Sequence, residues 1–301
     1  MALWLGDLFS TAEGPAQRRD PALRGTERIR EDQSHGEGNS VGAIRGPVRK
    51  IDLNCDMGES FGVYRIGADE EIMPLITSAN IACGFHGGDP QVMRRTVRLA
   101  REHGVAVGAH PGYRDLVGFW RRPVRCSPDE VYADVLYQIG ALAAFCRAEG
   151  VALRHVKPHG ALYNTAAADA AIAGAVARAV ADFDRSLMLY APPGSALEQA
   201  GLAAGLRVIR EGFADRGYAA DGTLLPRTHP GAVLHEPERA AAQARGMVCS
   251  GTVTADTGEE VAVPAETLCV HGDHPSVIQV LRRIRSELEA AGVSVGAPGA
   301  D

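Results

Sequence analysis

Short apolar runs alternate with longer amphipathic segments along most of the chain, and glycine marks many of the junctions. Gly104, Gly150 and Gly205 each end a helix-like segment and directly precede an apolar run. Glycine readily adopts the left-handed backbone that closes a helix, and valine, leucine and isoleucine favour buried strands. The pattern predicts strands at residues 50–55, 77–83, 105–109, 153–156, 187–190, 207–210 and 267–270.

Cap residues and prolines predict where the helices begin. Ser127 precedes Pro128 and stands three residues before Glu130, an arrangement typical of a helix N-terminus. The pattern predicts helices at residues 90–103, 128–149, 168–181, 195–204, 237–247 and 275–291. Strands that alternate with helices form a parallel sheet, and about seven such units favour a closed barrel. We therefore predict an α/β fold, a TIM-like (β/α) barrel with about seven strands.

Three segments depart from this rhythm. Residues 1–48 are rich in glycine and charged residues and offer few apolar positions to bury, so we expect a mostly disordered N-terminal extension. The barrel domain is expected to span residues 49–295, and residues 296–301 form a short tail. Within the barrel, the Asp-Thr-Gly sequence at 256–258 predicts a small β-hairpin insertion in the segment 252–263.

Composition narrows the range of partners and compartments. The 301 residues are 46% hydrophobic with a net charge of −6, which is ordinary for a globular protein and argues against nucleic acid as the main partner. No uncharged apolar run reaches the ~18 residues of a membrane span, and the N-terminus lacks the basic start of a signal peptide. We therefore predict a cytoplasmic protein with no membrane partner, whose six cysteines are reduced and mostly buried.

Polar side chains, most of them ionisable, follow almost every predicted strand. Three pairs at strand ends have the i, i+2 spacing that places both side chains on one face: Asn54 with Asp56, Lys157 with His159, and His271 with Asp273. Other polar residues at strand ends are Glu59, Asn80, His86, Asp89, His110, Glu211, Asp215 and Arg216. The carboxyl ends of parallel barrel strands open at one mouth, and burying many ionisable groups is costly unless function or pairing retains them. We therefore expect an active site at this mouth.

Each of these residues also has a simpler structural interpretation. Asp56 could cap a turn, and His86 could be a solvated loop residue. His110 could have a structural role, and Lys157 could form an ion pair. We expect His155, which lies deeper in its strand, to be a core histidine. Only the joint occurrence of these residues favours catalysis.

The type of ligand is less well defined by the sequence. The arginines between residues 114 and 125 fit either a solvated loop or a lid over a phosphate or carboxylate. The sequence contains no P-loop, no Rossmann glycine motif after a strand and no GxSxG motif. No nucleotide-binding loop and no nucleophilic serine or cysteine is therefore predicted.

Six blocks of sequence, spread in order over the predicted barrel, carry a resemblance. They read DLNCDMGE (52–59), SANIACGFHGGDP (78–90), GAHPGY (108–113), RHVKPHGALYN (154–164), EGFADRGYAADGTLLPR (211–227) and VHGD (270–273). With these blocks the chain resembles the LamB/YcsF family, which is also the family of 5-oxoprolinase A subunits. The resemblance implies a barrel-like (β/α) fold related to glycoside hydrolases and polysaccharide deacetylases, in agreement with the periodicity.

The resemblance also implies a reaction and partners. The family's reaction converts 5-oxoproline, ATP and water into glutamate, ADP and phosphate, with ATP as co-substrate and with two further subunits, B and C. A five-membered lactam is a stable amide, and phosphorylation of its oxygen would give an intermediate that water can open. In this interpretation subunits B and C make the intermediate, and the present chain completes its conversion.

On this resemblance we assign roles to the residues at the strand ends. Candidates for the general base that activates water are Asp56, His86 and His110. Candidates for stabilising charge on oxygen or phosphate are Lys157, His159 and Arg216. Candidates for orienting these groups or moving protons are Glu211, Asp215 and His271. Substrate contacts are expected from Asn54, Glu59, Asn80, Asp89, Asn164, Arg227 and Asp273.

Two alternatives remain open from the sequence. Asp56, His86 and His110 could form a metal site with an open position for water, which would make the chain a metal-dependent amide or polysaccharide deacetylase. The chain could instead be a non-catalytic scaffold component of a lactam-utilising complex. Whether this chain itself binds ATP or a divalent metal stays open. Trp120 also stands where the family commonly has a small residue.

Overall fold

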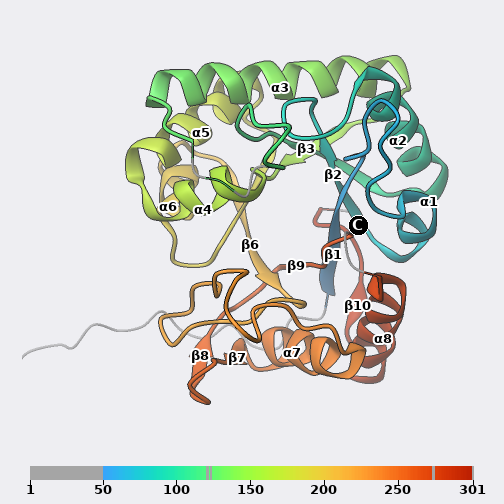
Figure 1. Cartoon of the computed structure of the whole chain (residues 1–301), viewed down its shortest axis with the longest axis vertical. Coiled ribbons are helices and arrows are strands. Elements are labelled where there is room, and N and C mark those ends of the chain that lie inside the picture. Colours follow the sequence, from blue (N-terminus) through green and yellow to red (C-terminus); the bar gives the residue numbers. More distant parts are fainter. Residues whose placement is uncertain (1–49, 120–121, 123, 273–274, 300–301) are drawn as a thin grey trace, which may run out of the picture. The chain divides into compact units, whose positions relative to one another are not determined.

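A closed barrel of seven parallel strands forms the centre of the fold (Figure 1). This computed structural model describes residues 50–119, 122, 124–272 and 275–299. The barrel strands are β1 (Lys50–Met57), β2 (Ser78–Ala82), β3 (Ala106–His110), β4 (Leu153–Val156), β5 (Met188–Ala191), β6 (Arg207–Phe213) and β9 (Thr267–Cys269). They pair in this order, and β9 pairs with β1 to close the barrel. The predicted (β/α) barrel is therefore confirmed.

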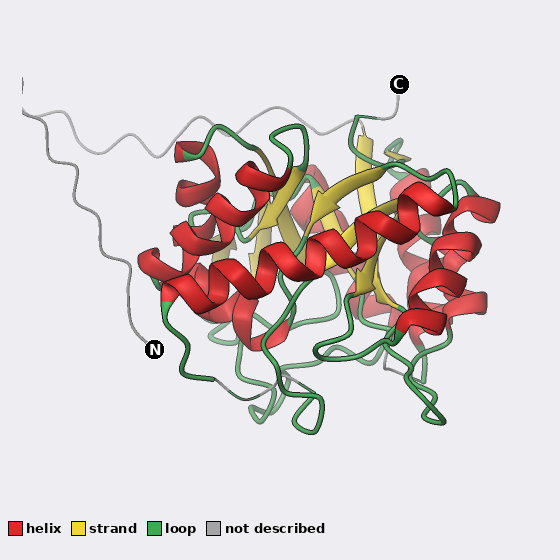
Figure 2. Cartoon of the chain, turned by 90° about the horizontal axis from the view of Figure 1, so that it is seen from above, coloured by secondary structure: helices red, strands yellow, loops and turns green. Residues whose placement is uncertain are grey.

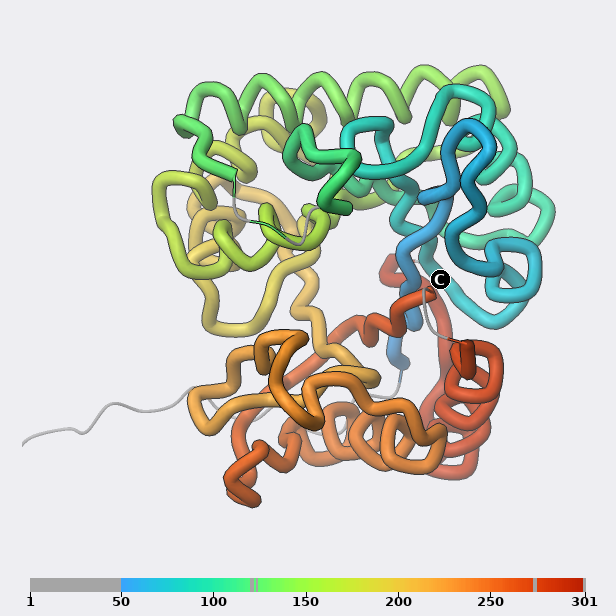
Figure 3. Tube along the Cα trace, in the orientation of Figure 1, coloured from blue at the N-terminus to red at the C-terminus, as the bar shows by residue number. Residues whose placement is uncertain are grey.

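Helices surround the strands on the outside of the barrel (Figure 2). They are α1 (Asp69–Ile72), the 3₁₀ helix η1 (Met73–Leu75), α2 (Pro90–His103), α3 (Pro128–Ala148), α4 (Gly160–Ala168), α5 (Ala170–Phe183), α6 (Ala196–Ala203), α7 (Pro237–Cys249) and α8 (Val277–Ala290). The tube view shows α7 and α8, which contact each other, packed side by side (Figure 3). Among the described residues, no helix is long and apolar enough to cross a membrane.

Local chemistry explains where helices start and stop. The side chain of Asp89 accepts the N–H groups of the first turn of α2, and Gly104 closes this helix with a φ of 66°. Ser127 and Glu130 form a capping box at the start of α3. The helix predicted at residues 168–181 corresponds to α5, but the sequence pattern misses α4, whose N-cap residue His159 makes no side-chain cap hydrogen bond.

Two smaller elements complete the described chain. The predicted hairpin is present as β7 (Thr252–Thr254) and β8 (Glu260–Ala262), which pair antiparallel. Near the C-terminus β10 (Ser294–Val295) pairs with the start of β1. The predicted N-terminal extension, residues 1–48, lies outside the described part of the chain, so the domain boundaries stay predictions.

Alternation along β1 gives the barrel an apolar outer face and a polar interior. The outward side chains join the core beneath the helices: Ile51, Leu53, Cys55 and Met57. The inward side chains are Asp52, Asn54 and Asp56, and each contacts residues of other strands. Because the strand runs toward the mouth, these three residues define a bottom, a middle and a top level of the interior.

Candidate active site

The bottom level centres on the buried carboxylate of Asp52. It accepts hydrogen bonds from four hydroxyl groups at 2.6–2.9 Å, those of Thr77, Ser78, Tyr190 and Thr267. Burial raises the pKa of Asp52, although the four hydroxyl donors oppose this shift. This level holds strands β1, β2, β5 and β9 together and forms the floor of the site.

The middle level is a network of amides. The Nδ2 group of Asn54 donates to Glu211 Oε1 at 3.0 Å, and its Oδ1 accepts from Asn80 Nδ2 at 2.7 Å. The Oδ1 atom of Asn80 lies 2.8 Å from His155 Nε2, and the His155 ring stacks on Tyr190 with centroids 4.2 Å apart. His155 is therefore buried in the interior below the mouth, where we expect a core histidine.

The top level contains a buried lysine between two carboxylates. Lys157, whose surface is 2% exposed, places its Nζ atom 3.1 Å from Asp56 Oδ1 and 2.8 Å from Glu211 Oε1. Burial alone would lower the pKa of Lys157, but the neighbouring carboxylates of Asp56 and Glu211 hold it well above its usual range. Burial would likewise raise the pKa of Asp56, yet His110 and Lys157 keep it well below its usual range. The lysine and Asp56 therefore form an ionised pair.

Cys269 also belongs to this level. Its Sγ atom lies 3.0 Å from Lys157 Nζ, and burial raises the pKa of this thiol well above its usual range. The thiol therefore stays protonated and accepts a hydrogen bond from the ammonium group. Cys269 lies two residues before His271, so the i, i+2 rule that pairs other strand-end residues could have indicated it.

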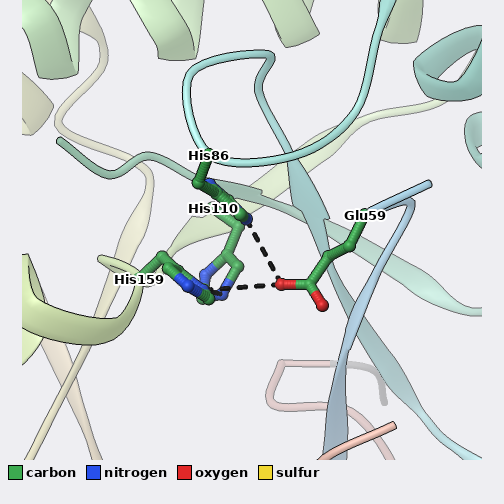
Figure 4. Close-up of side chains that lie close together, drawn as sticks. All are labelled: Glu59, His86, His110 and His159. Carbon is green, nitrogen blue, oxygen red and sulfur yellow. Dashed lines mark hydrogen bonds and ion pairs between the residues drawn. The ribbon is translucent and has the colours of Figure 1, made fainter. Parts of the chain in front are cut away.

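Three histidines and a glutamate lie close together (Figure 4), and one of the histidines, His110, contacts Asp56. Glu59 Oε1 lies 3.3 Å from His86 Nε2 and 3.5 Å from His159 Nδ1, and His159 Nδ1 lies 2.8 Å from His110 Nε2. The rings of His86 and His159 stack with centroids 3.9 Å apart. Burial lowers the pKa of both His86 and His159 well below the usual range, so these two imidazoles are neutral. Neutral imidazoles and a carboxylate make a donor set compatible with a divalent metal.

A second histidine–carboxylate pair lies across the mouth. His271 places Nδ1 2.9 Å from Asp215 Oδ2, and its backbone N–H donates to the same oxygen at 2.8 Å. Burial would raise the pKa of Asp215, but the neighbouring His271 and the hydrogen bonds from it lower it. Asp56, Cys269 and His271 have potential ligand atoms within 4.8 Å of one another, so this pair borders the lysine cluster.

Comparison with known proteins identifies the family. A family model described as the LamB/YcsF family matches residues 51–300. This chain belongs to the LamB/YcsF family.

Relatives and a solved structure support this membership. A Methylococcus capsulatus protein named as the A subunit of 5-oxoprolinase is 59% identical over 252 residues, which are 84% of this chain and 97% of that protein. A protein of the same name from one strain of Thermus thermophilus is 57% identical and covers 82% of this chain and 99% of its own length. The crystal structure of a lactam utilization protein from another strain of Thermus thermophilus is 55% identical, with a TM-score of 0.79 over 82% of this chain and 99% of that one.

Some strand-end candidates of this LamB/YcsF member have hydrogen-bond partners outside the lysine and histidine clusters, are exposed, or lie outside the described residues. Arg216 donates to the backbone carbonyls of a neighbouring loop, and Asp89 caps α2. Asn164 and Arg227 are exposed, and Asp273 lies outside the described residues, as does Trp120. The roles assigned to these residues from the sequence stay predictions.

The arginine-rich loop after β3 is partly neutralised by its own carboxylates. Arg114 pairs with Asp134 and lies over the ring of Phe85, and Arg122 pairs with Asp115. These pairs favour the solvated-loop interpretation over an anion-binding lid for Arg114 and Arg122. The guanidinium groups of both arginines are already paired with carboxylates of the protein, so they are not free to bind an anionic ligand.

Proposed function

We propose that this chain is the A subunit of an ATP-dependent 5-oxoprolinase, which cleaves 5-oxo-L-proline to L-glutamate while ATP is hydrolysed to ADP and phosphate. The observation that carries the proposal is the contact of Asp56 with both Lys157 and His110 at the barrel mouth. Relatives of 59% and 57% identity that are named as 5-oxoprolinase A subunits support the same assignment. The name of these relatives also supports partner subunits, which we propose to be B and C.

The charges at the top level suit the opening of an activated lactam. A first water molecule that attacks the ring carbon must lose a proton as the bond from this carbon to the ring nitrogen breaks, and a second water then releases phosphate, on whose oxygens negative charge develops. Asp56 is ionised and lies 3.3 Å from His110 Nε2, so this pair can accept the proton. Lys157 is positively charged and 2.8 Å from Glu211, so it is held in place to stabilise the developing charge.

The remaining groups have positioning roles in this proposal. Glu211 holds Lys157 and accepts a hydrogen bond from Asn54. Asp215 fixes the ring of His271 through Nδ1, so that a proton carried by Nε2 can be donated to the ring nitrogen as its bond to carbon breaks. ATP is the co-substrate in this proposal, and the partner subunits use it to make the activated intermediate.

A second candidate function is a metal-dependent amide hydrolase that needs no ATP. The cluster of Glu59, His86, His110 and His159 favours it, because three imidazoles and a carboxylate are a donor set for catalytic metals. The two candidates differ in whether glutamate appears without nucleotide.

A reconstitution assay separates these candidates. The purified full chain is mixed with candidate subunits B and C, 5-oxoproline and ATP, and glutamate and ADP are measured together. We expect equal amounts of both products from the complete mixture and none when this chain or ATP is left out. Glutamate from this chain alone without ATP would support the second candidate, and no glutamate from the complete mixture would reject the proposal.

A further inference from the structure

We propose that Glu59, His86, His110 and His159 bind one divalent transition-metal ion of the Zn²⁺ type. His110 ends β3, the other three residues lie in the loops after β1, β2 and β4, and all four are buried. Figure 4 shows that they point toward one another. Because binding is independent of the reaction, this metal site does not rest on the assignment of a 5-oxoprolinase.

The separations between the donor atoms match a first coordination shell. Zn²⁺ bound tetrahedrally to nitrogen and oxygen at about 2.0–2.1 Å requires neighbouring donors to lie about 3.3 Å apart. The observed separations are 3.3 Å from His86 Nε2 to Glu59 Oε1, 3.5 Å from His159 Nδ1 to the same oxygen, and 2.8 Å from His159 Nδ1 to His110 Nε2. All four donor atoms lie within 4.8 Å of one another, which is close enough for small side-chain shifts to bring them onto one ion.

The hydrogen bond on the far side of His110 fixes which nitrogen faces the cluster. His110 Nδ1 lies 2.7 Å from the carbonyl oxygen of Lys157, and a carbonyl oxygen can only accept, so Nδ1 carries a proton. In the neutral ring Nε2 then presents a lone pair toward His159 Nδ1 and toward Asp56 Oδ1 at 3.3 Å. The side of this lone pair that faces His159 Nδ1 is available to a cation held between the two imidazoles. Metal-binding histidines typically donate their other N–H to a carbonyl in this way.

The surroundings of the cluster also suit a bound ion. The ring of His159 hydrogen-bonds the backbone of Phe119, and the Phe119 ring packs edge-on against His159 and His86. Phe119 has a φ of 43°, a left-handed conformation that is uncommon for a bulky residue and is typical of functional sites. An apolar ring over the histidines limits access of water, which strengthens the binding of an ion by the donors beneath it.

The donor set differs from the Asp56, His86 and His110 set expected from the sequence. Asp56 already compensates Lys157 at 3.1 Å and groups with Cys269 and His271 instead. Glu59 takes the place of Asp56 as the carboxylate donor. Asp56 would then face the ion from outside its first shell, beside His110.

Metal content measured without any assay of activity tests the site. The purified full chain is stripped with a chelator, dialysed against Zn²⁺ or Co²⁺, and analysed by elemental analysis, calorimetric titration and the visible absorption of Co²⁺. We expect one ion per chain and a Co²⁺ spectrum typical of nitrogen and oxygen ligands. The variants His86→Ala and Glu59→Gln should bind at least ~100-fold more weakly, since even outer-shell losses cost 10–100-fold.

Matched variants keep the outcome interpretable. The control variant His103→Ala removes an exposed histidine and should keep one ion per chain. If His86→Ala does not fold, His159→Gln tests the same site with a smaller change. Asp56→Asn should also keep one ion, whereas a site built on Asp56 would lose it. Less than one tenth of an ion per wild-type chain with both metals, or full binding by folded Glu59→Gln and His159→Gln, would overturn the proposal.

Discussion

The replacement of Lys157 by methionine is expected to be among the most destabilising single changes in the barrel. Methionine has a similar length but no charge, so two buried carboxylates would lose their shared cation. Lys157 Nζ lies 2.8 Å from Glu211 Oε1 and 3.1 Å from Asp56 Oδ1. At an effective dielectric constant of about 20, each contact represents about 5–6 kcal/mol of attraction before desolvation is subtracted.

Most of this attraction offsets the cost of burying three charges, so the measured effect is smaller. Removal of one partner of a buried ion pair typically costs about 3–5 kcal/mol. For a domain of this size, such a loss lowers the melting temperature by roughly 6–20 °C. Urea unfolding followed by circular dichroism measures the free energy of unfolding directly, provided that the slope with urea is unchanged.

The sequence offers a matched control and a second-site test. Lys50 is the only other lysine and is exposed, so Lys50→Met should change the free energy of unfolding by less than about 0.5 kcal/mol. Adding Glu211→Gln to Lys157→Met removes one uncompensated charge and should restore part of the lost stability. A loss below about 1 kcal/mol for Lys157→Met, or no recovery in the double variant, would refute the ion-pair description.

Two further predictions concern a close contact inside the barrel and an ion pair outside it. A Cβ atom on Gly108 would lie 2.1 Å from His155 Nε2, so Gly108→Ala should lower the free energy of unfolding by about 1–3 kcal/mol. The control is Gly174→Ala in a helix. A Cβ atom there meets open space, so this variant should have an unchanged or higher free energy of unfolding. Equal stability of the two variants in urea would contradict the close packing. Hydrogen bonds from Arg98 and a second arginine lower the pKa of Glu149 to about 2. The unfolded pKa of a glutamate is about 4.3, so the ionised side chain stabilises the fold fully above that pH, and this stabilisation is lost as the pH falls toward 2. The difference in melting temperature between wild type and Glu149→Gln should therefore shrink from pH 7 to pH 3, and a constant difference would contradict this linkage.

The barrel could be predicted because its signals are local. The alternation in residues 50–57 separates inward polar from outward apolar side chains, and the glycines after helices mark where strands begin. Helix α4 was not predicted, because it starts at Gly160 directly after a strand-end segment and has no side-chain cap at its N-terminus. The short helix α1 likewise carries no side-chain cap that a sequence pattern could indicate.

The candidate site could be predicted in part for the same reason. The i, i+2 rule brings Lys157 and Asp56 to the interior, since both lie on strands or directly after them. The rule does not apply to Glu59, because this residue lies in a loop. The contact of Glu59 with the histidines could therefore be seen only in the three-dimensional fold. The floor formed by Asp52 was missed because its four hydroxyl partners lie as far as 215 residues away in the sequence.

The most direct test of the account is the turnover of the reconstituted complex with Asp56→Asn. Asparagine keeps the size of the side chain but cannot accept a proton, so glutamate release should fall by about 10²-fold or more while the melting temperature stays measurable and the chain stays folded. Asp129→Asn, which changes a carboxylate that is 92% exposed, should release glutamate at the wild-type rate. Wild-type turnover by a folded Asp56→Asn complex would show that the strand-end cluster does not perform the reaction.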